Sequence, residues 1–175
     1  MMILALVAFG LGVTILYTIS GQLDTSAKQL NEQTKDEINR ILLSPGIKVA
    51  FPKKIADVPR GDKHILGFGV KNTDPDYTDF KVETQCLKAY KDDNTEICND
   101  NVAGSECNDC DNWIINNGKF MEVAKREMEI DNLFIKVPKD AEYGEYIFKL
   151  EVKKYDGANT QGTYDTAKRF YVRVG

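Results

Sequence analysis

The apolar residues of this 175-residue chain follow two patterns, which meet at the turn Ser44-Pro45-Gly46. An uncharged block opens the chain, and no charged side chain occurs before Asp24. From there to Leu43 the apolar residues recur at spacings of three and four with charged residues on the opposite side, the period of an amphipathic α-helix. Proline disfavours helical geometry at the preceding residue. We therefore expect one helix of about 43 residues, roughly 65 Å long, that ends at this turn.

After the turn, apolar and polar residues alternate, which is the period of half-buried β-strands. Five segments alternate regularly, with apolar sets at Ile47/Val49/Phe51, Leu66/Phe68/Val70, Phe80/Val82/Thr84/Cys86, Tyr146/Phe148/Leu150/Val152 and Phe170/Val172/Val174. Apolar runs at 120–124 and 128–137 add two more. The expected fold class is therefore α+β, with a long N-terminal α-helix, apolar in its first half, over residues 1–45. An immunoglobulin-like antiparallel β-sandwich follows over residues 46–175.

Between residues 90 and 117 the alternation disappears and the composition turns to Asn, Asp, Gly and Cys, which indicates a long loop inserted into the sandwich. All four cysteines of the chain lie in this loop or just before it: Cys86, Cys98, Cys107 and Cys110. An even number of cysteines in an exported domain indicates two disulfides, and the three possible connectivities stay open. We expect an oxidising compartment outside the cell.

A metal or redox site is the alternative reading of the cysteines, because Cys107 and Cys110 have C-x-x-C spacing. A zinc knuckle needs a second close pair, whereas eleven residues separate Cys86 from Cys98. A thioredoxin-like motif belongs in a βαβ unit, which the pattern lacks. We therefore expect structural disulfides, no metal and no cofactor. A cluster of acidic and amide side chains could supply oxygen ligands to calcium, but its spacing is not that of an EF-hand. We therefore expect a solvated loop, with a calcium site as the alternative. The members of the cluster are Asp92, Asp93, Asn94, Asn99, Asp100, Asn101, Asp109 and Asp111.

The residues that usually carry catalysis are scarce. His64 is the single histidine, serine is sparse, and the sequence has neither a nucleophile motif nor a phosphate-binding glycine loop. We therefore predict that the chain is not an enzyme. The net charge of −4 comes from interspersed charges of both signs, so no basic surface is expected to follow phosphates and nucleic acid is not an expected partner.

The uncharged N-terminal block has the length of a bilayer-spanning segment, but no Lys or Arg precedes it as a single-pass anchor would require. Either a basic leader has been removed or the block leaves the bilayer. Gly10 and Gly12 would allow neighbouring helices to approach closely. The apolar side chains expected to make contacts between helices are Met1, Ile3, Leu4, Leu6, Val7, Phe9, Leu11, Val13, Ile15, Leu16, Ile19, Leu23 and Leu30.

Three features together resemble the type IV pilin superfamily, in particular its archaeal adhesion pilins and archaellins. They are the uncharged block from Met1 to Leu23, its amphipathic continuation to Leu43 and the all-β domain that follows. Ala5 stands where many bacterial pilins carry glutamate, which suits the archaeal branch. The segment 137–146 also resembles a hairpin of archaeal secreted immunoglobulin-like domains.

This resemblance implies a structural subunit of an extracellular pilus-like filament, polymerising through its N-terminal helix, with adhesion as the expected role. The partners it implies are copies of the same chain, the membrane before assembly, and export and assembly machinery. The alternatives are an archaellin of a motility filament and a membrane-anchored surface protein with a binding or accessory role. A secreted metal or redox protein is a third class, which rests on the C-x-x-C spacing alone.

Overall fold

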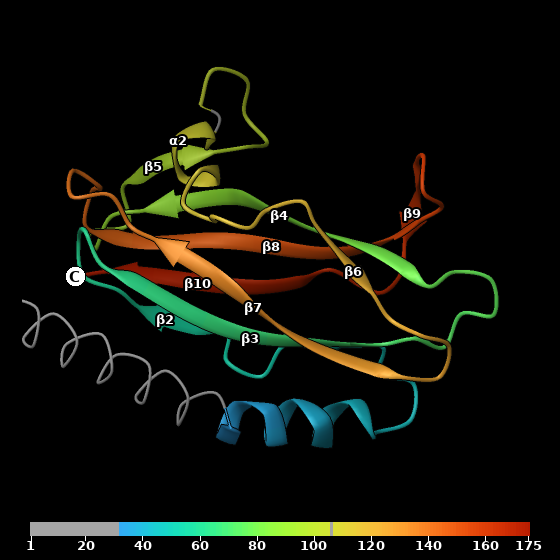
Figure 1. The fold of residues 1–175 in the computed structure, drawn as a ribbon. Helices are drawn as coiled ribbons and strands as arrows, with labels where there is room; N and C mark the ends of the chain where they lie inside the picture. Colours follow the sequence, from blue (N-terminus) through green and yellow to red (C-terminus); the bar gives the residue numbers. More distant parts are fainter. Residues whose placement is uncertain (1–31, 106) are drawn as a thin grey trace, which may run out of the picture. The chain divides into compact units, whose positions relative to one another are not determined.

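The computed structural model describes residues 32–105 and 107–175. By its contacts the chain divides into two compact units, Met1–Asp36 and Glu37–Gly175. The first unit lies almost entirely outside the described residues, and the second carries all the strands that the structure describes (Figure 1). The fold below is therefore that of the second unit, which we call the β-domain.

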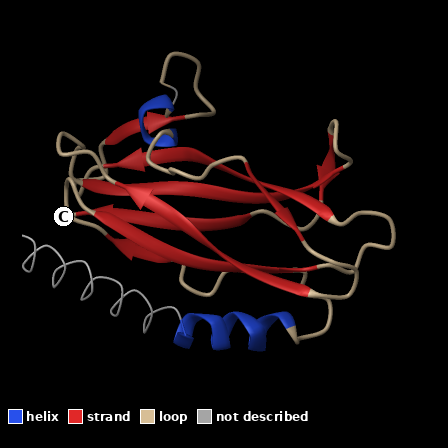
Figure 2. Cartoon of the chain, in the orientation of Figure 1, coloured by secondary structure: helices blue, strands red, loops and turns tan. Residues whose placement is uncertain are grey.

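The predicted α+β class is wrong. The described residues are predominantly β, and their helices are confined to residues 32–42 and to the four-residue α2, Asn108–Asp111 (Figure 2). The described residues contain no long apolar helix, and the apolar half of the predicted one lies outside them. A helical period in a sequence shows where apolar positions repeat, but it does not show which elements enclose the core of the domain. The layers that enclose the core set the class, and here they are two β-sheets.

Ten strands of the described residues make up these sheets. Their bounds are β1 Val49–Ala50, β2 Ile55–Asp57, β3 Lys63–Lys71, β4 Asp79–Tyr90, β5 Glu96–Asn99, β6 Lys119–Glu122, β7 Met128–Lys136, β8 Gly144–Tyr155, β9 Thr160–Thr163 and β10 Lys168–Val174. The smaller sheet has the order β1-β3-β7, and the larger has the order β2-β10-β8-β4-β5, with β6 added to β4 and β9 to β8. Among the described strands β10 and β2 pair in parallel, which departs from the all-antiparallel expectation.

The long strands β4 and β8 form the centre of the larger sheet, in register from Asp79↔Tyr155 to Tyr90↔Glu145 with a shift after Cys86. Their apolar side chains alternate inward, as the sequence predicts, and meet those of β3 and β7 in one buried core. Its largest side chains with almost no exposed surface are Phe68, Phe80, Phe148, Phe170, Leu66, Leu133, Ile135 and Leu150. The Phe148 and Phe170 rings stack with their centroids 5.1 Å apart.

The last turns of the helical segment lie on a different surface, the outer face of the smaller sheet. Ile38 and Leu42 are fully buried there with Ala50 in a second apolar cluster. Gly69 of β3 makes this close approach possible, because a methyl group built on it would lie 2.9 Å from the Leu42 Cδ1 atom. The Lys71 ammonium donates a hydrogen bond to the Leu42 carbonyl oxygen at 3.2 Å. The helix end is thus part of the β-domain.

Candidate functional site

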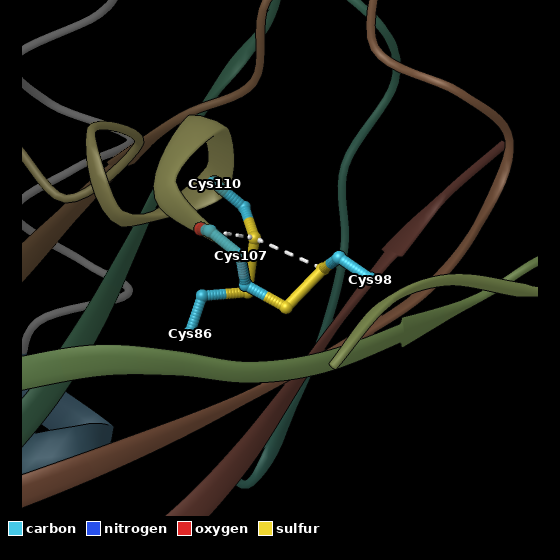
Figure 3. Close-up of side chains that lie close together, drawn as sticks. All are labelled: Cys86, Cys98, Cys107 and Cys110. Carbon is cyan, nitrogen blue, oxygen red and sulfur yellow. Dashed lines mark hydrogen bonds between the residues drawn. A yellow bond between two sulfur atoms is a disulfide. The ribbon is translucent and has the colours of Figure 1, made fainter. Parts of the chain in front are cut away.

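The four cysteines converge beside the larger sheet (Figure 3). Cys86 lies on β4, Cys98 on β5 and Cys110 in α2, which Cys107 caps at its N-terminal end. All are buried, the most exposed being Cys98 at 9%. Disulfides join Cys86 to Cys110 and Cys98 to Cys107, so the two predicted disulfides are confirmed and one of the three connectivities is selected.

The cysteine loop has its own hydrogen-bonded structure, contrary to the prediction of an irregular insertion. β5 pairs with the end of β4, with Cys98 opposite Ala89, and α2 follows as a single turn. Between them the Asn99 amide donates to the Ser105 carbonyl oxygen at 2.6 Å. Elements this short offer too few positions for a period to appear in the sequence. The loop therefore presents its cysteines on ordered backbone.

Two polar side chains attach the loop to the outer edge of β4. The Asp111 carboxylate accepts a hydrogen bond from the Cys86 amide. Burial raises the pKa of Asp111, the Asp100 carboxylate raises it further, and the Cys86 amide opposes both. Asn117 brackets Thr84, accepting from its amide at 2.7 Å and donating to its carbonyl oxygen at 3.0 Å. Around Thr84 and Cys86 this edge of β4 has no partner among the described strands, so the two side chains satisfy its backbone groups in place of a strand. They thereby hold the loop against β4 next to the cysteine cluster.

Trp113 anchors the end of the loop between the two sheets. Its ring is only 4% exposed and lies 4.3 Å from that of Tyr146 on β8. From Trp113 to Ile115 the chain pairs with β7: the Lys136 amide donates to the Trp113 carbonyl oxygen at 2.8 Å, and the Ile115 amide donates to the Phe134 carbonyl oxygen at 3.0 Å. The loop begins and ends on the larger sheet, and in between Trp113 and Ile115 bond β7 of the smaller sheet, so the loop joins the two layers.

A hollow of about 550 Å³ opens beside the disulfides. Cys98, Cys107 and Cys110 line it together with Trp113 and Tyr146. Its remaining charged lining is acidic, from Asp109, Asp140 and Glu142. The hollow therefore reaches the cysteine cluster past acidic side chains, of which Glu142 is paired with Lys91.

The outer face of the larger sheet carries a chain of ion pairs on β4 and β8. Glu83 contacts Lys81 at 2.8 Å and Lys153 at 2.6 Å, and Glu151 contacts Lys149 at 3.4 Å and Lys153 at 4.0 Å. Hydrogen bonds from Lys153 and Lys81 lower the pKa of Glu83. The face is partly exposed and its charges compensate one another, which is typical of a solvated sheet surface.

The other predicted site residues stand apart from this cluster. The thirteen apolar positions from Met1 to Leu30 lie outside the described residues. Several of the calcium candidates accept hydrogen bonds from backbone amides, such as Asp93 from Thr95 and Asp111 from Cys86. Across residues 32–105 and 107–175, the four cysteines are the one set of three or more metal-ligating side chains that lie close together. No helix in these ranges is long and apolar enough to span a membrane.

Comparison with known proteins finds similarity at the level of fold alone. No protein-family model matches the sequence, and no curated protein matches it. Among solved structures, a family 123 glycoside hydrolase from Clostridium perfringens is 12% identical over 69% of this chain, with a TM-score of 0.42. This chain spans only 22% of that hydrolase.

Two smaller proteins are also similar. The PapD-like domain 7 of human CEP192 is 12% identical over 76% of this chain and 91% of its own, with a TM-score of 0.39. MyfA, the major subunit of Myf fimbriae from Yersinia enterocolitica, is 13% identical over 73% of this chain and 99% of its own, also at 0.39. Similarity this low carries no argument about function. The β-domain belongs to the class of disulfide-bonded β-sandwich domains.

Proposed function

We propose that this chain is a structural, non-enzymatic subunit of an extracellular filament, a pilin of the type IV kind that polymerises through its apolar N-terminal segment. One observation carries the proposal: an uncharged segment from Met1 to Leu23 precedes a β-domain whose main core is built from its own two sheets. Every side chain of that core that the structure describes comes from the β-domain. The segment is therefore available to bury itself against lipid or against copies of itself.

The energetics support burial of this segment. Each large aliphatic side chain contributes about 1.5 to 3 kcal/mol when it leaves water, and the segment has no charge to favour solvent. A bilayer provides an apolar environment before assembly, and neighbouring subunits provide one in the filament. Packing between subunits would keep the segments buried after they leave the membrane.

The β-domain has features that suit an extracellular protein. Two buried disulfides persist in oxidising compartments, and both close the loop at the edge of the sandwich. Exposed apolar side chains lie in or close to this loop, Val102 at 47% and Ile115 at 60%. These side chains are available for contact with a surface, which favours adhesion as the role of the filament.

Charge placed in the apolar segment tests the proposal. Val7→Asp or Val13→Asp should abolish filaments, because burial of an unpaired carboxylate costs far more than burial of the valine contributes. Val102→Asp is the matched control, since it introduces the same charge at an exposed position of the β-domain. The measurement is electron microscopy of material sheared from cells expressing each variant, with mass spectrometry of the subunit.

The control should assemble like the wild type. Filaments of normal number and length from Val7→Asp or Val13→Asp would refute assembly through this segment. If Val102→Asp also loses its filaments, the added charge destabilises the protein in general. A circular dichroism spectrum of each variant tests this, because a variant that stays folded keeps its β-type spectrum.

A further inference from the structure

The four sulfur atoms are closer together than two independent disulfides require. All four lie within 4.8 Å of one another. The Cys98 and Cys110 sulfurs, which belong to different disulfides, are 3.9 Å apart (Figure 3). In a tetrahedral zinc site with Zn–S bonds of about 2.3 Å, the sulfurs are separated by about 3.8 Å. The spacing between the two disulfides thus already matches an edge of a tetrathiolate tetrahedron.

We propose that these cysteines form a Zn²⁺ site when both disulfides are reduced. Opening each disulfide lets its two sulfurs separate, while the distances between pairs need little change. The ligands come from three ordered elements, β4, β5 and the turn of α2, so they remain gathered after reduction. Cys107 and Cys110 supply a C-x-x-C pair, and Cys86 and Cys98 complete the set through the fold where the sequence does not place them together.

The surroundings fit a structural metal site. The cysteines are 0 to 9% exposed, so a bound ion would be shielded from water. Asp109 and Asp140 line the hollow and provide an entry path that attracts a divalent cation, whereas Glu142 on its rim is paired with Lys91. The Asp111 carboxylate accepts a hydrogen bond from the Cys86 amide, so a residue that does not itself bind the metal orients one of the ligands.

The chemistry balances with a dithiol as the reductant. Two dithiol molecules supply four electrons and four protons, reduce both disulfides to four thiols and become two cyclic disulfides. One Zn²⁺ then binds four thiolates and releases four protons, leaving a site with a charge of −2. Two molecules of a disulfide oxidant accept four electrons from the four thiolates by thiol–disulfide exchange, which re-forms both disulfides and releases the Zn²⁺ ion. The cysteine loop would therefore be held closed in a reducing compartment by zinc and in an oxidising one by disulfides, independently of what the filament does.

The test uses the full chain in detergent, reduced with a dithiol and loaded with Co²⁺ or Zn²⁺. We expect one metal ion per chain and, with Co²⁺, the charge-transfer and d–d bands of a tetrahedral tetrathiolate. Adding an oxidant should release the ion and abolish the bands. Cys98→Ser/Cys107→Ser is the matched variant, because it keeps the Cys86–Cys110 pair. Under the same reduction it should lose the tetrathiolate spectrum and bind less than one ion.

Folding is followed in parallel by circular dichroism and by cleavage after Glu96 with a glutamate-specific protease. The proposal holds if the reduced protein keeps its β spectrum and binds metal, or if it unfolds and Zn²⁺ restores both the spectrum and resistance to cleavage. It is overturned if reduced protein neither binds an equivalent of metal nor regains its fold with Zn²⁺. Equal binding by Cys98→Ser/Cys107→Ser would overturn it as well.

Discussion

At the scale of single residues, His64 couples the stability of the β-domain to pH. It lies on β3 opposite Ile135, and its Nε2 atom is buried with no hydrogen-bond partner. Burial lowers the pKa of His64 below 6.5, the nearby Lys53 lowers it further, and Asp57 acts in the opposite direction. The folded domain therefore favours the neutral imidazole.

We predict that His64 does not reduce the free energy of unfolding above pH 6.5. This free energy then decreases as the pH drops from 6.5 toward the lowered pKa of His64 in the folded state. The unfolded chain takes up the proton first, so acid favours unfolding. Urea denaturation above and below pH 6.5 measures the effect, with His64→Gln as the comparison because it cannot ionise. If the variant loses as much stability as the wild type over this range, the imidazole is not responsible.

The cysteines show what a sequence can and cannot predict about a site. Their oxidation followed from an even count in one irregular segment, whereas their pairing did not, because pairing depends on which sulfurs the backbone brings together. Cys86 and Cys110 meet only because α2 lies against β4, and α2 is too short to appear as a helical period. Asn117 and Trp113 were also missed as anchors, since neither makes its contacts with sequence neighbours.

At the scale of elements, the two disulfides close chain segments of different length, which predicts different contributions. Cys86–Cys110 spans 24 residues and Cys98–Cys107 spans 9. In the chain-entropy treatment, losing the longer link costs about 0.9 kcal/mol more than losing the shorter one. Denaturation of Cys86→Ser/Cys110→Ser and Cys98→Ser/Cys107→Ser measures the difference. A less stable Cys98→Ser/Cys107→Ser variant would contradict the prediction.

The end of the helical segment provides a second prediction at this scale. Gly69→Ala should destabilise the β-domain by about 1 to 3 kcal/mol, because the new methyl group meets Ile38 and Leu42. Shortening the opposing side chain should relieve the clash, so Gly69→Ala/Ile38→Ala should cost less than the two single changes together. Thermal unfolding of all four proteins gives the coupling. Strict additivity would show that the helix end does not press on Gly69.

The elements that the sequence predicted are those long enough to show a period. β4, β8 and β10 alternate in burial over seven residues or more and lie where the alternation placed them. β3 lies where Leu66, Phe68 and Val70 placed it, although all its residues from Leu66 to Val70 are buried. β2, β5 and β9 have three or four residues and were missed. β9 is exposed throughout, so no inward face marks it. The error of class arose at the N-terminus, where a helical period was extended into a long element that the described residues do not contain.

At the scale of the whole molecule, folding and assembly rest on different parts of the chain. The core that joins the two sheets lies within Glu37–Gly175, whereas the proposed assembly energy lies in the uncharged segment before Asp24. Ile38 and Leu42 are buried on the smaller sheet, so a fragment that isolates the β-domain has to begin at Glu37. Cutting at Gly46 would remove both side chains and expose Gly69 and Ala50.

The most direct measurement is analytical ultracentrifugation of the Glu37–Gly175 fragment beside the full chain, with electron microscopy of both samples. We expect a monomeric fragment with a β-type spectrum and a cooperative melt, at concentrations where the full chain forms filaments. Filaments formed by the fragment alone, for example by strand exchange between sheets, would contradict assembly through the N-terminal segment.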